Sequence, residues 1–329
     1  MTKGQQQSGR PPKRHHTLPR FWLRGFTNPD LPPRYEPFVF CWDARVSAWT
    51  KRSPKNATVR PNYYSYRDLT GHLNLEVETG LAMLESVSAP AIRALLSRVQ
   101  IGLREQMYLA HFVALLMLRV PFWQDVVSER AGRIGQEYLL RVVSEMKANP
   151  KLFAEHMRRW REIRGKNGVA FSIEKLEQHL PTVSLNKAGR LGAAFAPLEQ
   201  LAEDIYKMDW EFAFSQPPDY LIASDNPVGL TNASVPEHVV PGVRLPGTVL
   251  TAPLARNLVL IASRGEAGRV FSRIDRATVA RVNLATADFS HGLLFSPKKA
   301  FPGTEAILKG NYRWRSPTVD LHCTVPLWI

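Results

Sequence analysis

The stretch REQMYLAHFVALLML, residues 104–118, is apolar on nearly every side when it is arranged as a helix. A helix without a polar face is typical of the buried centre of a helical layer. After Trp210 the pattern changes to the period of strands, beginning with WEFAF at 210–214. Helices in the middle of the chain, followed by a run of strands, predict an α+β fold with a mostly antiparallel C-terminal sheet.

The segments around the central stretch also have helical periodicity. In residues 75–96 the apolar side chains recur at steps of three and four, and Pro90 is expected to kink or break that helix. Pro121 is expected to bend or end the central one. Further helices are predicted at 129–147, 151–164, 172–179 and 192–207.

The second half of the chain predicts strands separated by loops rich in proline and glycine. The predicted strands are YLIAS at 220–224, GTVLTAP at 247–253, NLVLIAS at 257–263, LLF at 293–295 and DLHCTVPLWI at 320–329. Residues 275–289 return to a helical pattern, with Asp275 as a plausible N-cap. FVFCWD at 38–43 and residues 48–50 predict a hairpin that is a candidate to join the sheet.

Domain organisation follows from the same patterns. Residues 1–14 are polar, contain Gly and Pro and have no periodicity, so we expect a disordered basic arm. Residues 15–329 are then a single α+β domain, with a helical part at about 75–207 and a β-rich part at about 210–329.

Positive charge is concentrated near the N-terminus. The chain has a net charge of +14, and its first sixty residues contain 12 Lys and Arg against 3 Asp and Glu. Such a concentration attracts polyanions, above all nucleic acid, although a solubilising tail is the alternative.

Other features favour a cytoplasmic protein that does not associate with membranes. The first residues contain no apolar signal region, and the longest apolar run, 109–118, is far shorter than the roughly 20 residues of a membrane span. Cys41 and Cys323 lack the spacing of a zinc site, so we expect two reduced thiols. The sequence predicts no metal and no cofactor, and it does not indicate an oligomeric state.

Several short motifs follow one another along the chain. They are HTLPRFWLRGF at 16–26, FVFCWD at 38–43, NYYS at 62–65, Glu78 with Glu85, Arg119-Val120-Pro121, SDNPV at 224–228 and Pro253-Leu254. In number and order they resemble the bacterial family DUF4238, over residues His16 to about Pro297. The family is uncharacterised, so the resemblance implies no activity.

Several motif residues are candidates for a site. His16 titrates near neutral pH and is a candidate general acid/base or phosphate contact, or else it fixes the turn before Pro19. Arg20 and Arg24, four residues apart, either grip a phosphate or pair with Glu78 and Glu85. Those two carboxylates lie about 10 Å apart along a helix, which favours ion pairs over joint catalysis.

Arg119 and the turn after residue 224 are the other candidates. Arg119 follows an apolar run, so its guanidinium needs a partner: Glu78, Asp225 or a bound anion. Asp225 and Asn226 precede a proline at a strand end, where such side chains either form a turn or build a site. Asn283 and His291 flank the late helix and are candidates to face the same end.

A basic run on a predicted helix offers a second contact surface. Arg158, Arg159, Trp160 and Arg161 combine charge with a ring that can stack on a base, although such a run is more often a solvated helix face. The chain contains no GxGxxG, P-loop, HExxH or GxSxG motif, so nucleotide-fold, zincin and serine-hydrolase functions have no support.

These residues support three hypotheses. The first is a phosphodiester-cleaving enzyme acting on RNA or DNA, with His16 as acid/base, Arg20 and Arg119 stabilising charge, and Asp225 with Asn226 orienting groups. The second is a non-catalytic nucleic-acid-binding or regulatory protein that uses the arm, Arg24 and Arg158–Arg161. The third is a structural or partner-binding protein, in which all the motifs serve packing.

Overall fold

The structure, a computed structural model, describes residues 14–68, 70–164, 172–178, 182–236, 240–265 and 270–309. The predicted arm, except Arg14, and the predicted strand at 320–329 lie outside these residues. Arg14 itself begins the first strand, β1. Among the described residues, no single helix is long and apolar enough to span a membrane. The pair α3 and α4 has the necessary length and apolarity only when the two helices are taken together, and they are bent by 65° at their junction.

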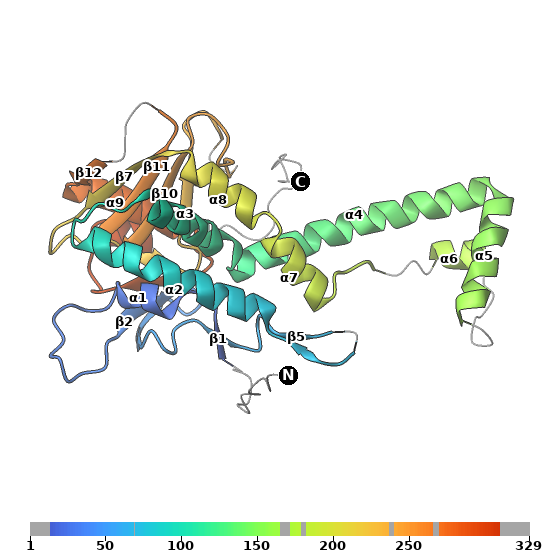
Figure 1. The fold of residues 1–329 in the computed structure, drawn as a ribbon, viewed down its shortest axis with the longest axis horizontal. Helices are drawn as coiled ribbons and strands as arrows, with labels where there is room; N and C mark the ends of the chain where they lie inside the picture. Colours follow the sequence, from blue (N-terminus) through green and yellow to red (C-terminus); the bar gives the residue numbers. More distant parts are fainter. Residues whose placement is uncertain are drawn as a thin grey trace, which may run out of the picture. The chain divides into compact units, whose positions relative to one another are not determined.

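The α+β fold predicted from the sequence is confirmed (Figure 1). The helices are α1 (Arg20–Arg24), α2 (Glu76–Leu96), α3 (Leu103–Leu118), α4 (Pro121–Ala148), α5 (Pro150–Arg164), α6 (Ile173–Gln178), α7 (Lys187–Phe195), α8 (Leu198–Tyr206), α9 (Arg276–Asp288) and α10 (Thr304–Lys309). Pro90 lies inside α2 and does not end it. The helix predicted at 192–207 is instead two helices, because Pro197 lies between α7 and α8.

The strands form four sheets. They are β1 (Arg14–His16), β2 (Val39–Asp43), β3 (Ala48–Arg52), β4 (Val59–Pro61), β5 (Tyr66–Arg67), β6 (Leu73–Asn74), β7 (Asp209–Phe214), β8 (Ala223–Ser224), β9 (Gly229–Thr231), β10 (Val249–Ala255), β11 (Leu258–Ser263), β12 (Val270–Arg273) and β13 (Leu293–Ser296). A five-stranded sheet has the order β12-β7-β11-β10-β9, in which only β12 and β7 are parallel. The predicted N-terminal hairpin is β2 and β3, and it pairs with β13 and β8 in a separate four-stranded sheet.

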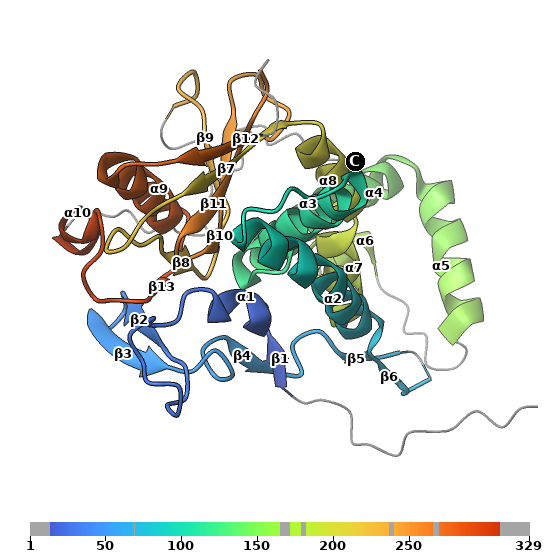
Figure 2. The ribbon, with the colours of Figure 1, turned by 60° about the vertical axis from the view of Figure 1, so that its left-hand side comes forward.

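The five-stranded sheet is buried on both faces, with α3 on one side and α9 on the other (Figure 2). In β11, Leu258, Leu260 and Ala262 belong to the core cluster that includes α3. Val259 and Ile261 alternate with them and pack with Val279 and Val282 of α9. Successive side chains of a strand point to opposite faces, so a strand covered on both faces has a continuous apolar run.

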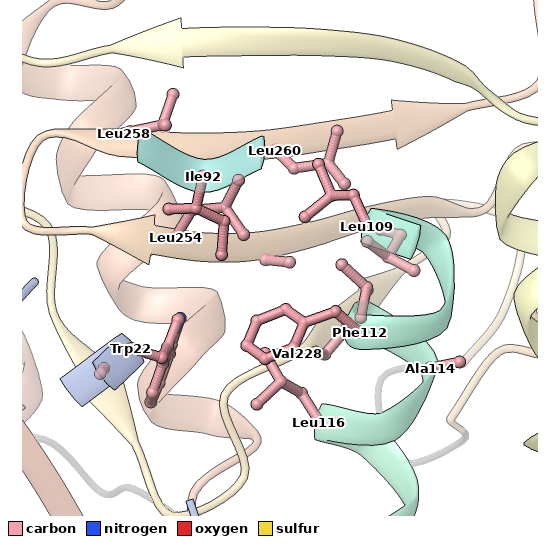
Figure 3. Packing of buried hydrophobic residues seen from close by; sticks show 14 of the residues in the cluster. Trp22, Ile92, Leu109, Phe112, Ala114, Leu116, Val228, Leu254, Leu258 and Leu260 are labelled. Atoms are coloured by element: carbon pink, nitrogen blue, oxygen red, sulfur yellow. The ribbon is translucent and has the colours of Figure 1, made fainter. Parts of the chain in front are cut away.

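The main core lies between α3 and this sheet. Leu109, Phe112 and Leu116 of α3 lie toward Leu254 of β10 and Leu260 of β11 (Figure 3). Trp22 of α1 is buried in the same cluster, and its indole N–H donates to the Pro253 carbonyl at 3.0 Å. These contacts anchor the N-terminal segment, where the candidates His16, Arg20 and Arg24 lie.

The chain divides into two compact units, residues 1–124 with 191–329, and residues 125–190. The second unit contains most of α4, with α5 and α6. Gly135 allows a close approach within it, because a Cβ there would lie 2.4 Å from Cγ1 of Val183. The single domain expected from residue 15 to residue 329 stays a prediction about cooperative folding.

Candidate functional site

Arg119 caps the C-terminus of α3, and its side chain is only 2% exposed. One guanidinium nitrogen, Nη1, donates to Glu85 Oε1 of α2 at 2.7 Å. The other, Nη2, donates to the backbone carbonyl of His16 at 2.6 Å. The partner is therefore Glu85, and not Glu78 or Asp225 as the sequence suggested. The ion pair joins α3, α2 and β1.

The histidine next to His16 is the more deeply placed one. His15 is fully buried in β1, where its Nδ1 accepts the backbone N–H of Tyr64 at 2.8 Å and lies 3.6 Å from Glu78 Oε2. Its ring stacks on Tyr64, whose hydroxyl donates to the Arg119 carbonyl at 2.7 Å. Sequence reasoning missed His15 and Tyr64, although HTLPRFW begins with the second histidine of a His-His pair and NYYS contains the tyrosine.

His16 points to the other side of β1 and is half-buried. Its Nε2 lies 3.1 Å from the carbonyl oxygen of Lys55. Arg14, two residues earlier on the same face, donates to the Asn56 side chain at 2.6 Å. The exposed side of β1 is thus a basic edge, while its buried side belongs to the cluster of His15 and Tyr64.

Asp225 holds the connection between two strands. Its carboxylate accepts the backbone N–H groups of His291 at 2.7 Å and of Leu293 at 3.2 Å. Burial raises the pKa of Asp225 to about 6, although these N–H donors favour the charged form. The hydroxyl of Ser224 donates to the Asn226 carbonyl at 2.8 Å. The local turn is therefore made by the Ser224 hydroxyl, whereas the Asp225 carboxylate binds backbone groups of the later segment 291–293.

His291 links this turn to the end of α3. Its ring stacks on Phe122, with centroids 3.9 Å apart, and Phe122 follows Arg119 by three residues. Burial lowers the pKa of His291 to about 4, and its Nε2 has no hydrogen-bond partner among the described residues. Arg119 therefore contacts His16 directly, whereas Asp225 binds the backbone of His291, whose ring stacks on Phe122.

Most of these polar groups bind within the protein. The guanidinium of Arg119 donates to a carboxylate and a carbonyl, although its buried Nε has no hydrogen-bond partner among the described residues, and Asp225 accepts from two backbone N–H groups. In the part of the chain that the structure describes, no group of three or more His, Cys, Asp and Glu side chains is placed to hold a metal ion. The arrangement holds β1, β8 and β13 against the helices.

The remaining candidates lie on the surface. Arg20 and Arg24 of α1 are exposed, and neither pairs with Glu78 or Glu85 as one alternative proposed. On α5, Arg158 pairs with Glu162 at 3.8 Å and Arg159 with Glu155 at 2.8 Å. Trp160 is 38% exposed, but two residues along a helix it is turned about 200° from Arg158. Arg158 and Trp160 thus do not share one face of α5.

A basic surface, defined here by the unpaired cations of residues 14–60, is the largest concentration of free charge among these candidates. Nine Lys and Arg occur in that range, and only Arg45 and Arg52 form ion pairs with a described residue, both with Asp43. The other seven are exposed, namely Arg14, Arg20, Arg24, Arg34, Lys51, Lys55 and Arg60.

The low pKa of His291 predicts a change in the pH dependence of stability. In the unfolded chain this histidine takes up a proton below a pKa of about 6.5, whereas folded His291 does so only near 4. The stability of the folded state that depends on neutral His291 is therefore lost as the pH falls through that range. The free-energy difference between wild type and His291→Gln should fall by about 2 kcal/mol from about pH 7 to about pH 5. Urea denaturation at each pH measures it.

The opposite trend of Asp225 does not obscure this comparison. Its folded pKa of about 6 is above the unfolded value, so its contribution is lost as the pH rises toward 6. Asp225 is present in both proteins, and its effect cancels in the difference. A difference that stays constant between the two pH values would contradict the assignment to His291.

Comparison with known proteins identifies the family of this chain but does not assign an activity to it. The family described as "Protein of unknown function (DUF4238)" matches residues 14–300, and the match begins where β1 begins. The resemblance inferred from the motifs is therefore confirmed. No curated protein and no solved structure matches the chain.

Proposed function

We propose that this chain, which belongs to the DUF4238 family, binds nucleic acid through its basic surface. The observation that supports this proposal is the set of seven exposed cations between Arg14 and Arg60 that have no carboxylate partner among the described residues. Unpaired surface cations near a phosphate backbone release its counterions, and that release provides most of the affinity of sequence-independent binding.

The distribution of charge along the chain supports the same proposal. Residues 125–190 carry 13 Lys and Arg against 8 Asp and Glu. Outside that range and the first sixty residues, the chain carries 18 of each sign. The excess is thus confined to two segments, whereas charge that serves solubility alone has no reason to be restricted in this way.

Phosphodiester cleavage is the second function that we propose, because His16 lies within the basic surface. Its half-buried ring meets the backbone carbonyl of Lys55, and Arg14 lies on the same face of β1. In this proposal His16 transfers a proton to or from a bound phosphate, and the exposed Arg20 stabilises the developing charge. Arg119, Asp225 and Asn226 then act as supports, since their polar groups are used within the protein.

The charge contribution is tested by fluorescence anisotropy with a labelled oligonucleotide at several salt concentrations. The logarithm of the wild-type affinity should fall steeply with the logarithm of salt, and the double variant Arg20→Gln/Arg24→Gln should reduce that slope by about two. The matched control is Arg45→Gln/Arg276→Gln, which also removes two exposed charges, but from ion pairs with Asp43 and Asp219. Its slope should change less.

Two results would overturn these proposals. No binding at low ionic strength would leave the excess charge as a solubility feature and end the nucleic-acid function. For cleavage, the same oligonucleotide is analysed on a denaturing gel after incubation with wild type and His16→Gln. Intact oligonucleotide with wild type, or equal cleavage by both, would end the role of His16. A cytoplasmic location, where nucleic acid is accessible and the buried Cys41 stays a free thiol, is part of the proposal.

A further inference from the structure

Two phenylalanine rings lie side by side on the outer face of the hairpin. Phe38 and Phe40, two residues apart, are both half-buried, and their rings meet edge to face with centroids 5.2 Å apart. In β2 the side chains of Val39, Cys41 and Asp43 are buried, so the even-numbered positions form the other face of the strand. The two rings therefore belong to one surface.

Cations border this pair of rings on two sides. Lys51 lies opposite Phe40 in the β2–β3 register, and its Nζ is 4.8 Å from the Phe38 centroid and 5.9 Å from that of Phe40. Lys299, which follows β13, has its Nζ 5.9 Å from the Phe40 centroid. Both lysines are exposed, and neither forms an ion pair with a described residue. β13 lies directly beside β2 in the sheet (Figure 2).

Aromatic side chains also pack together at the other end of the hairpin. Trp42 and Trp49 pack together at 5.5 Å, and Trp49 meets Phe301, in the cluster that includes α10. The aromatic side chains at that end pack on one another and on α10, whereas Phe38 and Phe40 at the other end have lysine ammonium groups as neighbours. Each lysine ammonium lies within cation–π distance of a ring, so the two rings and the two positive charges form one surface.

We infer that Phe38 and Phe40 form a platform on which bases of a single-stranded nucleic acid stack, while Lys51 and Lys299 bind the adjoining phosphates. Aromatic rings beside a basic track are the means by which proteins bind single strands without reading the sequence. In a duplex the bases are paired and stacked on one another, so their faces are not accessible for stacking on the phenylalanine rings. This inference rests on the proposed function and assigns its preferred substrate class.

The experiment compares single strands with a duplex on the full-length protein. Labelled oligo(dT) and oligo(rU) of about 15 nucleotides, together with a duplex of the same length, are titrated with wild type, Phe40→Leu and Phe38→Leu. We expect each variant to weaken single-strand binding by about tenfold and to leave duplex binding within about twofold. The salt slope should not change, because no charge is lost. Weakened binding of either the RNA or the DNA strand supports the platform.

Tyr138→Leu is the matched control, since Tyr138 is an exposed aromatic residue, at 59%, outside the hairpin. It should leave single-strand binding unchanged, and the melting temperature of each variant shows that the fold is retained. Equal affinities of wild type and both Phe variants for single strands would overturn the platform while salt-dependent binding continues. Failure of the proposed function is different, because then no nucleic acid binds in any arm.

Discussion

Replacing Arg119 with methionine is expected to lower the free energy of unfolding by about 3–5 kcal/mol. The guanidinium is buried, and its removal leaves Glu85, whose side chain is 24% exposed, without its partner at 2.7 Å. The carbonyl of His16 loses a donor at the same time. A half-buried carboxylate without its partner, together with a carbonyl without its donor, is among the more costly local changes in a folded protein.

Two further variants separate the ion pair from general packing. Arg24→Met removes an exposed arginine without an ion pair and should change stability by less than about 0.5 kcal/mol. In Arg119→Met/Glu85→Leu no charge is left behind, so the double variant should recover much of the loss. Urea denaturation measures all three, and a loss below about 1 kcal/mol for Arg119→Met would show that the buried pair does not hold the motif residues together.

The layers of the fold were predictable because they follow from periodic apolar patterns. The run at 104–118 is mostly buried from Leu109 onward, while its first turn is partly exposed. Residues 258–262 are apolar throughout because helices cover both faces of their strand. The strand predicted at 220–224 is shorter, with only Ala223–Ser224 in a ladder. The residues before it are held by other groups, among them the carbonyl of Arg256, which accepts from the N–H of Leu221. Apolar composition does not reveal such partners.

The polar contacts were less predictable because they depend on register and on distant residues. Which of the two adjacent histidines is buried depends on which face of β1 meets the helices. The segment RHH is too short to show a strand pattern from which that face could be predicted. Glu78 and Glu85 lie on the same side of α2, two turns apart, so the sequence gives no reason to prefer one as the partner of Arg119. Only the position of α3 along α2 makes that choice.

The second large effect is expected at Asn283, a fully buried residue of α9 whose single amide holds three backbone groups. Its Oδ1 accepts the N–H of Ile222 at 3.0 Å, and its Nδ2 donates to the carbonyls of Tyr220 and Pro302, each at 3.0 Å. The amide thus fixes the approach to β8 and the loop before α10. Asn283→Asp keeps the size of the side chain but replaces both N–H donors by an oxygen.

At about pH 7 this variant should lose about 3–5 kcal/mol of unfolding free energy, since two carbonyls lose their donor and face a buried negative charge. The introduced carboxyl group will have a folded pKa above its unfolded value, so the protein is least destabilised in acid, and the loss grows as the pH rises through the folded pKa. Protonated, the group still donates to one of the two carbonyls.

Asn232→Asp provides the matched control. Asn232 makes similar bonds, accepting the N–H of Ser234 at 2.9 Å and donating to the Pro246 carbonyl at 2.8 Å, but it is accessible to water. Water solvates both the new charge and the freed carbonyl there, so the loss should stay below about 1.5 kcal/mol and depend little on pH. Equal losses in the two variants would show that burial does not amplify the role of Asn283. A loss confined to Asn283→Asp would identify that amide as the main polar support of the turn that carries Asp225.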